Sequence, residues 1–150
     1  MNVAKQLISC ASVVAALSLF TMSPADAQES SYTPGTVWEF SQIQTEPGQS
    51  ERYIDWLASN WKKIQEYGKK EGYVVSYHVF TVNNPRAGEP DLVLAIEYKD
   101  YMTTAQRLAA QKKIESLMSM DTRKMDAAAG ERKSMRKVIS GIELQELVLK

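Results

Sequence analysis

A single histidine and a nearby carboxylate carry the clearest chemistry in this sequence. His78 and Ser76 alternate along one β-rich segment, and Glu97 lies on the next one. Side chains two residues apart share a face of a strand, and a hairpin that gathers the apolar residues makes Glu97 a near cross-strand neighbour of His78. A histidine beside a carboxylate can act as a general base or ligate haem. The alternative is a structural pair that only completes the packing.

Two further glutamates and one aromatic residue complete the candidate site. Glu39 and Glu143 belong to the first and last β-rich segments, which we expect to be adjacent strands. Paired carboxylates can share a proton or hold a metal, but two carboxylates and one histidine do not make a recognisable metal motif. The alternative is a pair of solvent-exposed charges at the rim. The predicted catalytic residues are His78 and Glu97, the predicted ligand contacts are Glu39, Ser76, Phe80 and Glu143, and no metal is expected.

The segments that must position these residues follow a regular order. Residues 36–44, 73–82, 91–98 and 142–149 are β-rich, whereas residues 47–72, 103–120 and 121–137 have helical spacing or composition. Turn residues fill the hairpin loop 83–90, Gly72 is a helix C-cap, and Thr103 with Gln106 forms a capping box. The order β-α-β-β-α-α-β predicts a ferredoxin-like α+β domain, with a four-stranded antiparallel sheet and helices on one face.

Both faces of the predicted sheet are rich in apolar residues. We expect the helices to cover Trp38, Phe40, Val75, Tyr77, Val79, Leu92, Leu94, Ile96, Ile142, Leu144 and Val148. The opposite face then carries Ile43, Val74, Phe80, Val82, Val93, Ala95, Leu147 and Leu149 among the polar site residues. A face this apolar is rarely left in water, so we expect a second copy of the chain to cover it and the polar residues to line the cleft between the two sheets.

The stretches VWEFSQIQTEPGQSERYIDWL and DLVLAIEYKD, within residues 36–149, resemble the dimeric α+β barrel superfamily. The resemblance implies a homodimer in which two ferredoxin-like sheets enclose a cavity. The superfamily includes cofactor-free monooxygenases, haem-degrading enzymes, dehydratases and stress proteins, so membership alone does not select a function. No catalytic residue of any of these groups can be carried over to this chain.

The first 27 residues have the pattern of a secretory signal peptide. Lys5 precedes an apolar run over residues 7–22, and Ala25-Asp26-Ala27 is a small-x-small cleavage site. Cys10 could instead be the lipidated residue of a lipoprotein, but it lies before most of the apolar run. That run is shorter than the roughly 20 residues that span a bilayer. We therefore expect a periplasmic or secreted protein without a stable membrane anchor, with a flexible leader at 28–35 and one domain at 36–150.

The charge balance bears on possible partners. The chain has 18 basic and 18 acidic residues, whereas a nucleic-acid-binding protein needs a basic surface that neutralises phosphates. The last predicted helix has a basic cluster that could bind acidic lipid or an anionic ligand: Arg123, Lys124, Arg132, Lys133, Arg136 and Lys137. Acidic residues interrupt the cluster, so we interpret it as a solvated helix face.

Together these features predict an exported homodimer that binds a small, largely apolar molecule without a cofactor. If the domain is catalytic, the most concrete mechanism is cofactor-free oxidation or proton transfer, with His78 as the base and Glu97 as the residue that orients it. The alternatives are a non-catalytic stress or ligand-binding module and a haem-binding protein in which His78 is the axial ligand. The sequence leaves open whether the protein is an enzyme.

Overall fold

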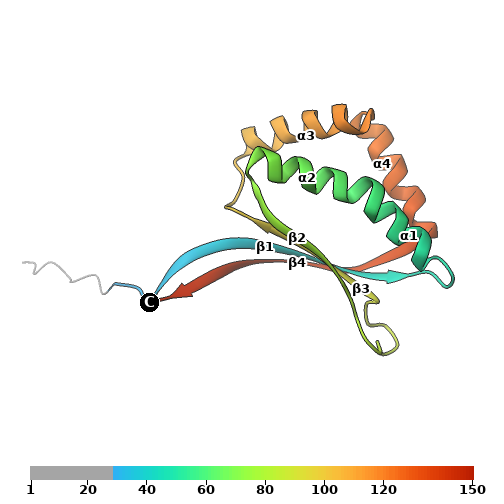
Figure 1. Cartoon of the computed structure of the whole chain (residues 1–150), viewed down its shortest axis with the longest axis horizontal. Coiled ribbons are helices and arrows are strands. Elements are labelled where there is room, and N and C mark those ends of the chain that lie inside the picture. Colours follow the sequence, from blue (N-terminus) through green and yellow to red (C-terminus); the bar gives the residue numbers. More distant parts are fainter. Residues whose placement is uncertain (1–28) are drawn as a thin grey trace, which may run out of the picture.

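A computed structural model describes residues 29–150 of the chain, so the predicted signal peptide and Cys10 lie outside the described residues. The elements are β1 (Tyr32–Thr45), α1 (Ser50–Trp56), α2 (Lys62–Glu71), β2 (Val74–Thr81), β3 (Leu92–Tyr98), α3 (Thr104–Met118), α4 (Thr122–Glu131) and β4 (Arg136–Leu149) (Figure 1). A π-helical turn, Leu57–Trp61, joins α1 to α2, and a 3-10 turn, Arg132–Ser134, leads from α4 into β4.

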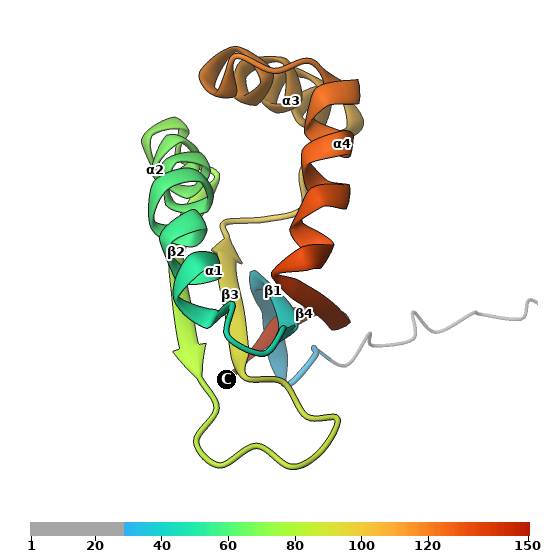
Figure 2. The ribbon, with the colours of Figure 1, turned by 90° about the vertical axis from the view of Figure 1, so that its right-hand side faces the viewer.

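The four strands form one antiparallel sheet in the order β2-β3-β1-β4. The helices all lie on one side of the sheet, with α3 farthest from it (Figure 2). The predicted ferredoxin-like α+β fold is therefore confirmed. No helix within residues 29–150 is long and apolar enough to cross a membrane.

Local signals in the sequence place the ends of two helices correctly. Gly72 follows α2 in the left-handed conformation, with a φ of 80°, as expected of a glycine C-cap. Thr103 and Gln106 form the predicted capping box at the start of α3: the Thr103 hydroxyl accepts from the Gln106 backbone, and the Thr103 N–H donates to Gln106 Oε1 at 2.8 Å.

Two predicted boundaries were wrong, and strand pairing explains both. The predicted leader is ordered from Tyr32, because Tyr32 pairs with Leu149 and extends β1 along β4. The last predicted helix ends at Glu131, and β4 already begins at Arg136. Ser140 and Gly141 do not interrupt this strand, because they pair with Gln42 and Ser41 of β1; the irregularity in the register lies at Ile139. β1 and β4 thus continue as a ribbon past the rest of the sheet (Figure 1).

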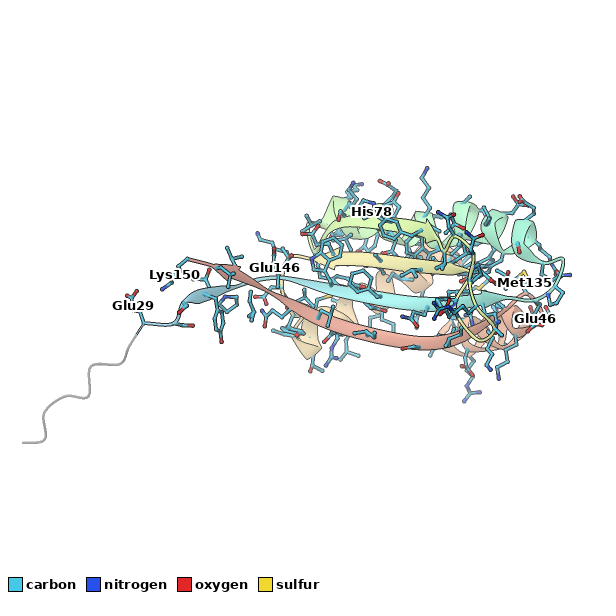
Figure 3. The ribbon with its side chains drawn as sticks, turned by 90° about the horizontal axis from the view of Figure 1, so that it is seen from below. Glu29, Glu46, His78, Met135, Glu146 and Lys150 are labelled. Carbon is cyan, nitrogen blue, oxygen red and sulfur yellow. The ribbon has the colours of Figure 1, made fainter. Side chains whose placement is uncertain are left out.

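The register also corrects the predicted faces of β1, a central strand, and of β4, an edge strand. Trp38 lies opposite Glu97 and Leu144, and Phe40 lies opposite Ala95 and Ile142. These residues therefore share the face that no helix covers, which we call the open face (Figure 3). On β1, β2, β3 and β4, the open face comprises Trp38, Phe40, Gln42, Ser76, His78, Phe80, Val93, Ala95, Glu97, Ser140, Ile142 and Leu144. The predicted faces of β2 and β3 were right except at Val74. An irregularity in the register between Val74 and Ser76 turns Val74 toward α2, where it is buried. The predicted faces of β1 and β4 were exchanged.

The hydrophobic core occupies the α1 end of the helix-covered face. It contains Ile43, Tyr53, Leu57, Leu92, Leu94 and Met135, with Trp56 and Trp61 packed against them. Arg132 and Arg136, which we had interpreted as part of a solvated helix face, belong to the edge of this core. The Arg132 guanidinium carbon lies 4.3 Å from the centre of the Trp56 ring, and that of Arg136 lies 5.8 Å from the centre of the Tyr53 ring. Stacking on aromatic rings therefore draws both arginines out of solvent.

Candidate functional site

The open face brings four of the predicted site residues together. Ser76 Oγ donates a hydrogen bond of 2.7 Å to Glu97, whereas His78 lies opposite Ala95 and stacks on Phe80 with ring centres 5.6 Å apart. His78 is exposed on β2, at the edge of the sheet (Figure 3). Within residues 29–150, Glu97 is hydrogen-bonded to Ser76 and not to His78. The catalytic roles of His78 and Glu97, and haem ligation by His78, stay predictions.

Glu39 and Glu143 lie on the other side of the sheet. Their strands are adjacent as predicted, and the two residues lie directly opposite each other. They do not join His78, because Glu39 pairs with Ile96 and so faces the helices. The prediction that they line a cleft on the open face was therefore wrong. Their partner is Tyr98, whose hydroxyl donates a hydrogen bond of 3.1 Å to Glu39.

The environment of Tyr98 favours its protonated form. Burial is the largest cause that raises the pKa of its hydroxyl, followed by the charge of Glu39 and the hydrogen bond to it, with smaller effects of Tyr73 and Glu143. Ionised Tyr98 would place a negative charge against Glu39, whereas the neutral hydroxyl donates to that carboxylate. The hydroxyl of Tyr98, at the end of β3, is thus kept protonated.

We expect this tyrosine to make stability fall at high pH. A pKa raised above the ordinary value of 10.0 contributes stability below pH 10 that is lost as the pH rises toward the folded-state pKa. Urea unfolding between pH 8 and 11.5 should show a shallower loss of unfolding free energy in Tyr98→Phe than in the wild type. Tyr101→Phe, at an exposed position in the loop after β3, is the matched control. Equal pH slopes in the wild type and Tyr98→Phe would contradict this role.

A cavity adjoins Tyr98 at the end of the helix-covered face away from the core. Its volume is about 260 Å³, and it lies between α2, α3, α4 and the end of β3. The residues that line it are Ile64, Gln65, Tyr73, Tyr98, Met102, Arg107, Ala110, Gln111, Ile114 and Met125. Half of these side chains are aliphatic or thioether groups, and the other half carry a hydroxyl, an amide or a guanidinium. This composition is typical of a small-molecule site.

A larger cleft continues from this cavity toward solvent. It has a volume of about 530 Å³ and shares Tyr73, Met102 and Ala110 with the cavity. Two more tyrosines, Tyr67 and Tyr101, also line the cleft. Because the two hollows share these walls, a molecule could reach the cavity by way of the cleft.

The sequence analysis missed the residues that line this cavity. Tyr98 was read only as the end of a strand, although it shares a face with the buried Leu94 and Ile96. Gln65 lies four residues after Trp61 and eight after Leu57, on the buried stripe of its helix. A polar residue at such a position is a signal that could have been used.

Within the described residues, no three histidine, cysteine, aspartate or glutamate side chains gather as a metal site. No protein-family model and no curated protein matches the chain. Similar solved structures include HapK from Hahella chejuensis, with 13% identity, a TM-score of 0.48, and coverage of 73% of this chain and 91% of HapK. Protein SO0527 from Shewanella oneidensis has 12% identity, a TM-score of 0.49, and coverage of 78% and 98%.

A nipsnap family protein with unknown function from Agrobacterium tumefaciens is similar at 12% identity and a TM-score of 0.45, with coverage of 77% of this chain and 90% of that one. At these levels of similarity, none of the three structures transfers a function to this chain.

Proposed function

We propose that the protein binds a small, largely apolar molecule in the cavity beneath α3. The observation that carries this proposal is a cavity of about 260 Å³ at the end of the helix-covered face away from the core. Neither α3 nor α4 contains a buried residue, so these helices border the cavity without filling it. The aliphatic and thioether side chains of this hollow offer surface on which an apolar molecule can be buried, and such binding would stabilise the folded protein.

Filling the cavity is expected to abolish binding. Ala110 lies on α3 and lines both the cavity and the cleft, so Ala110→Trp places an indole in that space. With 4-fluorotoluene as the probe, fluorine NMR should show saturable binding to the wild type and a loss of at least about tenfold in Ala110→Trp. Ala127→Trp, at an exposed position on α4 that lines neither hollow, should bind the probe like the wild type. No binding to the wild type, or equal binding to all three proteins, would overturn the proposal.

We also propose that the open face pairs with a second copy of the chain, as the dimeric α+β barrel resemblance implies. Several apolar side chains on this face are exposed, including Phe80 at 51%, Leu144 at 52% and Ile142 at 42%. Contiguous apolar patches of this kind are uncommon on monomeric proteins. The face continues into the β1–β4 ribbon, where Leu147 and Leu149 are also exposed. A two-stranded ribbon is marginally stable alone in water, so contact with a second copy would stabilise it.

The proposed place of action is outside the cytoplasm, because residues 1–27 have the pattern of a signal peptide. A non-catalytic binding protein and an enzyme would share this cavity and this dimer. Proton transfer to or from the bound molecule is the catalytic form of the proposal, since Tyr98 contacts both the cavity and the Glu39 carboxylate.

A further inference from the structure

Gln65 places a polar amide at the cavity, and the binding of a purely apolar molecule gives that amide no role. This residue lies on α2, is only 6% exposed and is the buried polar residue of the described chain. Burying an amide without a hydrogen bond is costly, so such groups are normally paired. Among the hydrogen bonds of residues 29–150, however, none involves the Gln65 side chain. Water can pair such an amide from the cavity, and a ligand that displaces this water must replace its hydrogen bonds.

The amide of Gln65 is not fully enclosed by protein. In the described part of the chain, the fully enclosed side-chain nitrogen and oxygen atoms without a hydrogen bond are Nε of Arg132 and Nε of Arg136. The amide atoms of Gln65 are not among them, so the small exposed fraction of this residue includes its polar end. Since Gln65 lines the cavity, that exposure faces the cavity.

The groups around Gln65 favour an uncharged oxygen group on the ligand. Tyr98 brings the Glu39 and Glu143 carboxylates close to the wall of the cavity, which disfavours an anion there. Arg107 also lines the cavity, but its side chain is exposed and its guanidinium donates to Thr104, so solvent screens its charge. Burial, Tyr67 and Glu71 raise the pKa of Tyr73, so its hydroxyl remains a neutral donor at the same wall.

We propose that the ligand is an uncharged, single-ring molecule with one hydroxyl or carbonyl oxygen, and that this oxygen pairs with the Gln65 amide. The inference rests on the proposed function, because it assigns the ligand class of that cavity. An amide both donates and accepts, so it matches a phenolic hydroxyl as well as a carbonyl. An apolar cavity of roughly 150 Å³ holds benzene, and about 260 Å³ therefore suits a substituted ring.

Two probes of nearly equal shape test the role of Gln65. 4-Fluorophenol carries a hydroxyl where 4-fluorotoluene carries a methyl group, so the ratio of their dissociation constants isolates the contribution of the oxygen. Fluorine NMR should show that Gln65→Leu weakens 4-fluorophenol binding roughly tenfold relative to 4-fluorotoluene, the size expected for one buried hydrogen bond. Gln145→Leu, at an exposed position of β4 that lines neither the cavity nor the cleft, should leave the ratio unchanged.

A second measurement uses the wild type and so does not depend on the folding of a variant. The side-chain N–H signals of Gln65 in an amide NMR spectrum should shift with 4-fluorophenol and not with 4-fluorotoluene. The proposed ligand class is wrong if both probes bind but Gln65→Leu leaves the ratio of their dissociation constants unchanged. It is also wrong if both probes shift the Gln65 side-chain signals equally. In either case the cavity remains a binding site. If neither probe binds to the wild type, the proposed function itself fails.

Discussion

Gly68→Ala is expected to lower the free energy of unfolding, although alanine is the better helix former. A Cβ at Gly68 would lie 2.6 Å from Val74 Cγ2 and 2.9 Å from Tyr73 Cε2, well inside normal contact distances. Overpacking of this kind costs about 1–3 kcal/mol, which outweighs the helix-propensity gain of about 1 kcal/mol. Urea unfolding should therefore show a lower midpoint for the variant. The close approach of Val74 and Tyr73 to α2 therefore favours glycine at position 68.

The chain supplies a matched control for this prediction. Gly130 lies in α4, and a Cβ at Gly130 would meet no atom within 4 Å, so Gly130→Ala should raise the free energy of unfolding by about 0.5–1 kcal/mol. Tyr73 also lines the cavity, so Gly68→Ala should weaken 4-fluorotoluene binding while Gly130→Ala leaves it unchanged. If Gly68→Ala and Gly130→Ala raised the free energy of unfolding equally, the prediction would be contradicted, because α2 and β2 would then have room for a methyl group at Gly68.

The order of the elements could be predicted because each has a local signal. Gly72, the Thr103–Gln106 capping box and the turn residues at 83–90 mark ends of helices and strands through backbone geometry that depends on neighbouring residues only. That order restricts the sheet to few arrangements, and the observed strand order β2-β3-β1-β4 is the ferredoxin-like one.

The faces of β1 and β4 could not be predicted, because apolar content decides a face only when the other face is polar. On β1, Trp38 and Phe40 outweigh Val37 and Ile43 in apolar area, yet Val37 and Ile43 are each only 2% exposed. The aromatic pair instead stacks on the open face, with ring centres 5.8 Å apart. The pairing of a strand with its neighbours decides which of its alternating side chains lie on each face of the sheet. A shift of one residue in that pairing moves every side chain to the other face.

The same exchange of faces divided the predicted site. Ser76, His78, Phe80 and Glu97 were placed together correctly because β2 and β3 form a hairpin, whose register follows from short-range pairing. Glu39 and Glu143 were separated from them because β1 pairs with strands far away in the sequence. The cavity depends on how α3 lies over Tyr98 and Gln65, which is a tertiary contact without a local signal.

The corrected open face strengthens the case for a dimer, since Trp38, Phe40, Ile142 and Leu144 add to the apolar residues already expected there. We expect Phe80→Lys to convert a dimer into a folded monomer. Phe80 is 51% exposed on this face, and a two-fold interface would contain the substituted residue twice. Burying an unpaired ammonium costs several kcal/mol, so the dissociation constant should rise more than about a hundredfold.

Light scattering and sedimentation at micromolar concentration measure this change directly. The wild type should have twice the mass of the mature chain and Phe80→Lys the mass of one chain, with an unchanged circular dichroism spectrum. Leu108→Lys, at a position of α3 that is 56% exposed and distant from the open face, should remain dimeric. Because the cavity lies on the helix side of the sheet, the Phe80→Lys monomer should still bind 4-fluorotoluene. A wild type that stays monomeric at these concentrations would refute pairing through the open face and leave the cavity site intact.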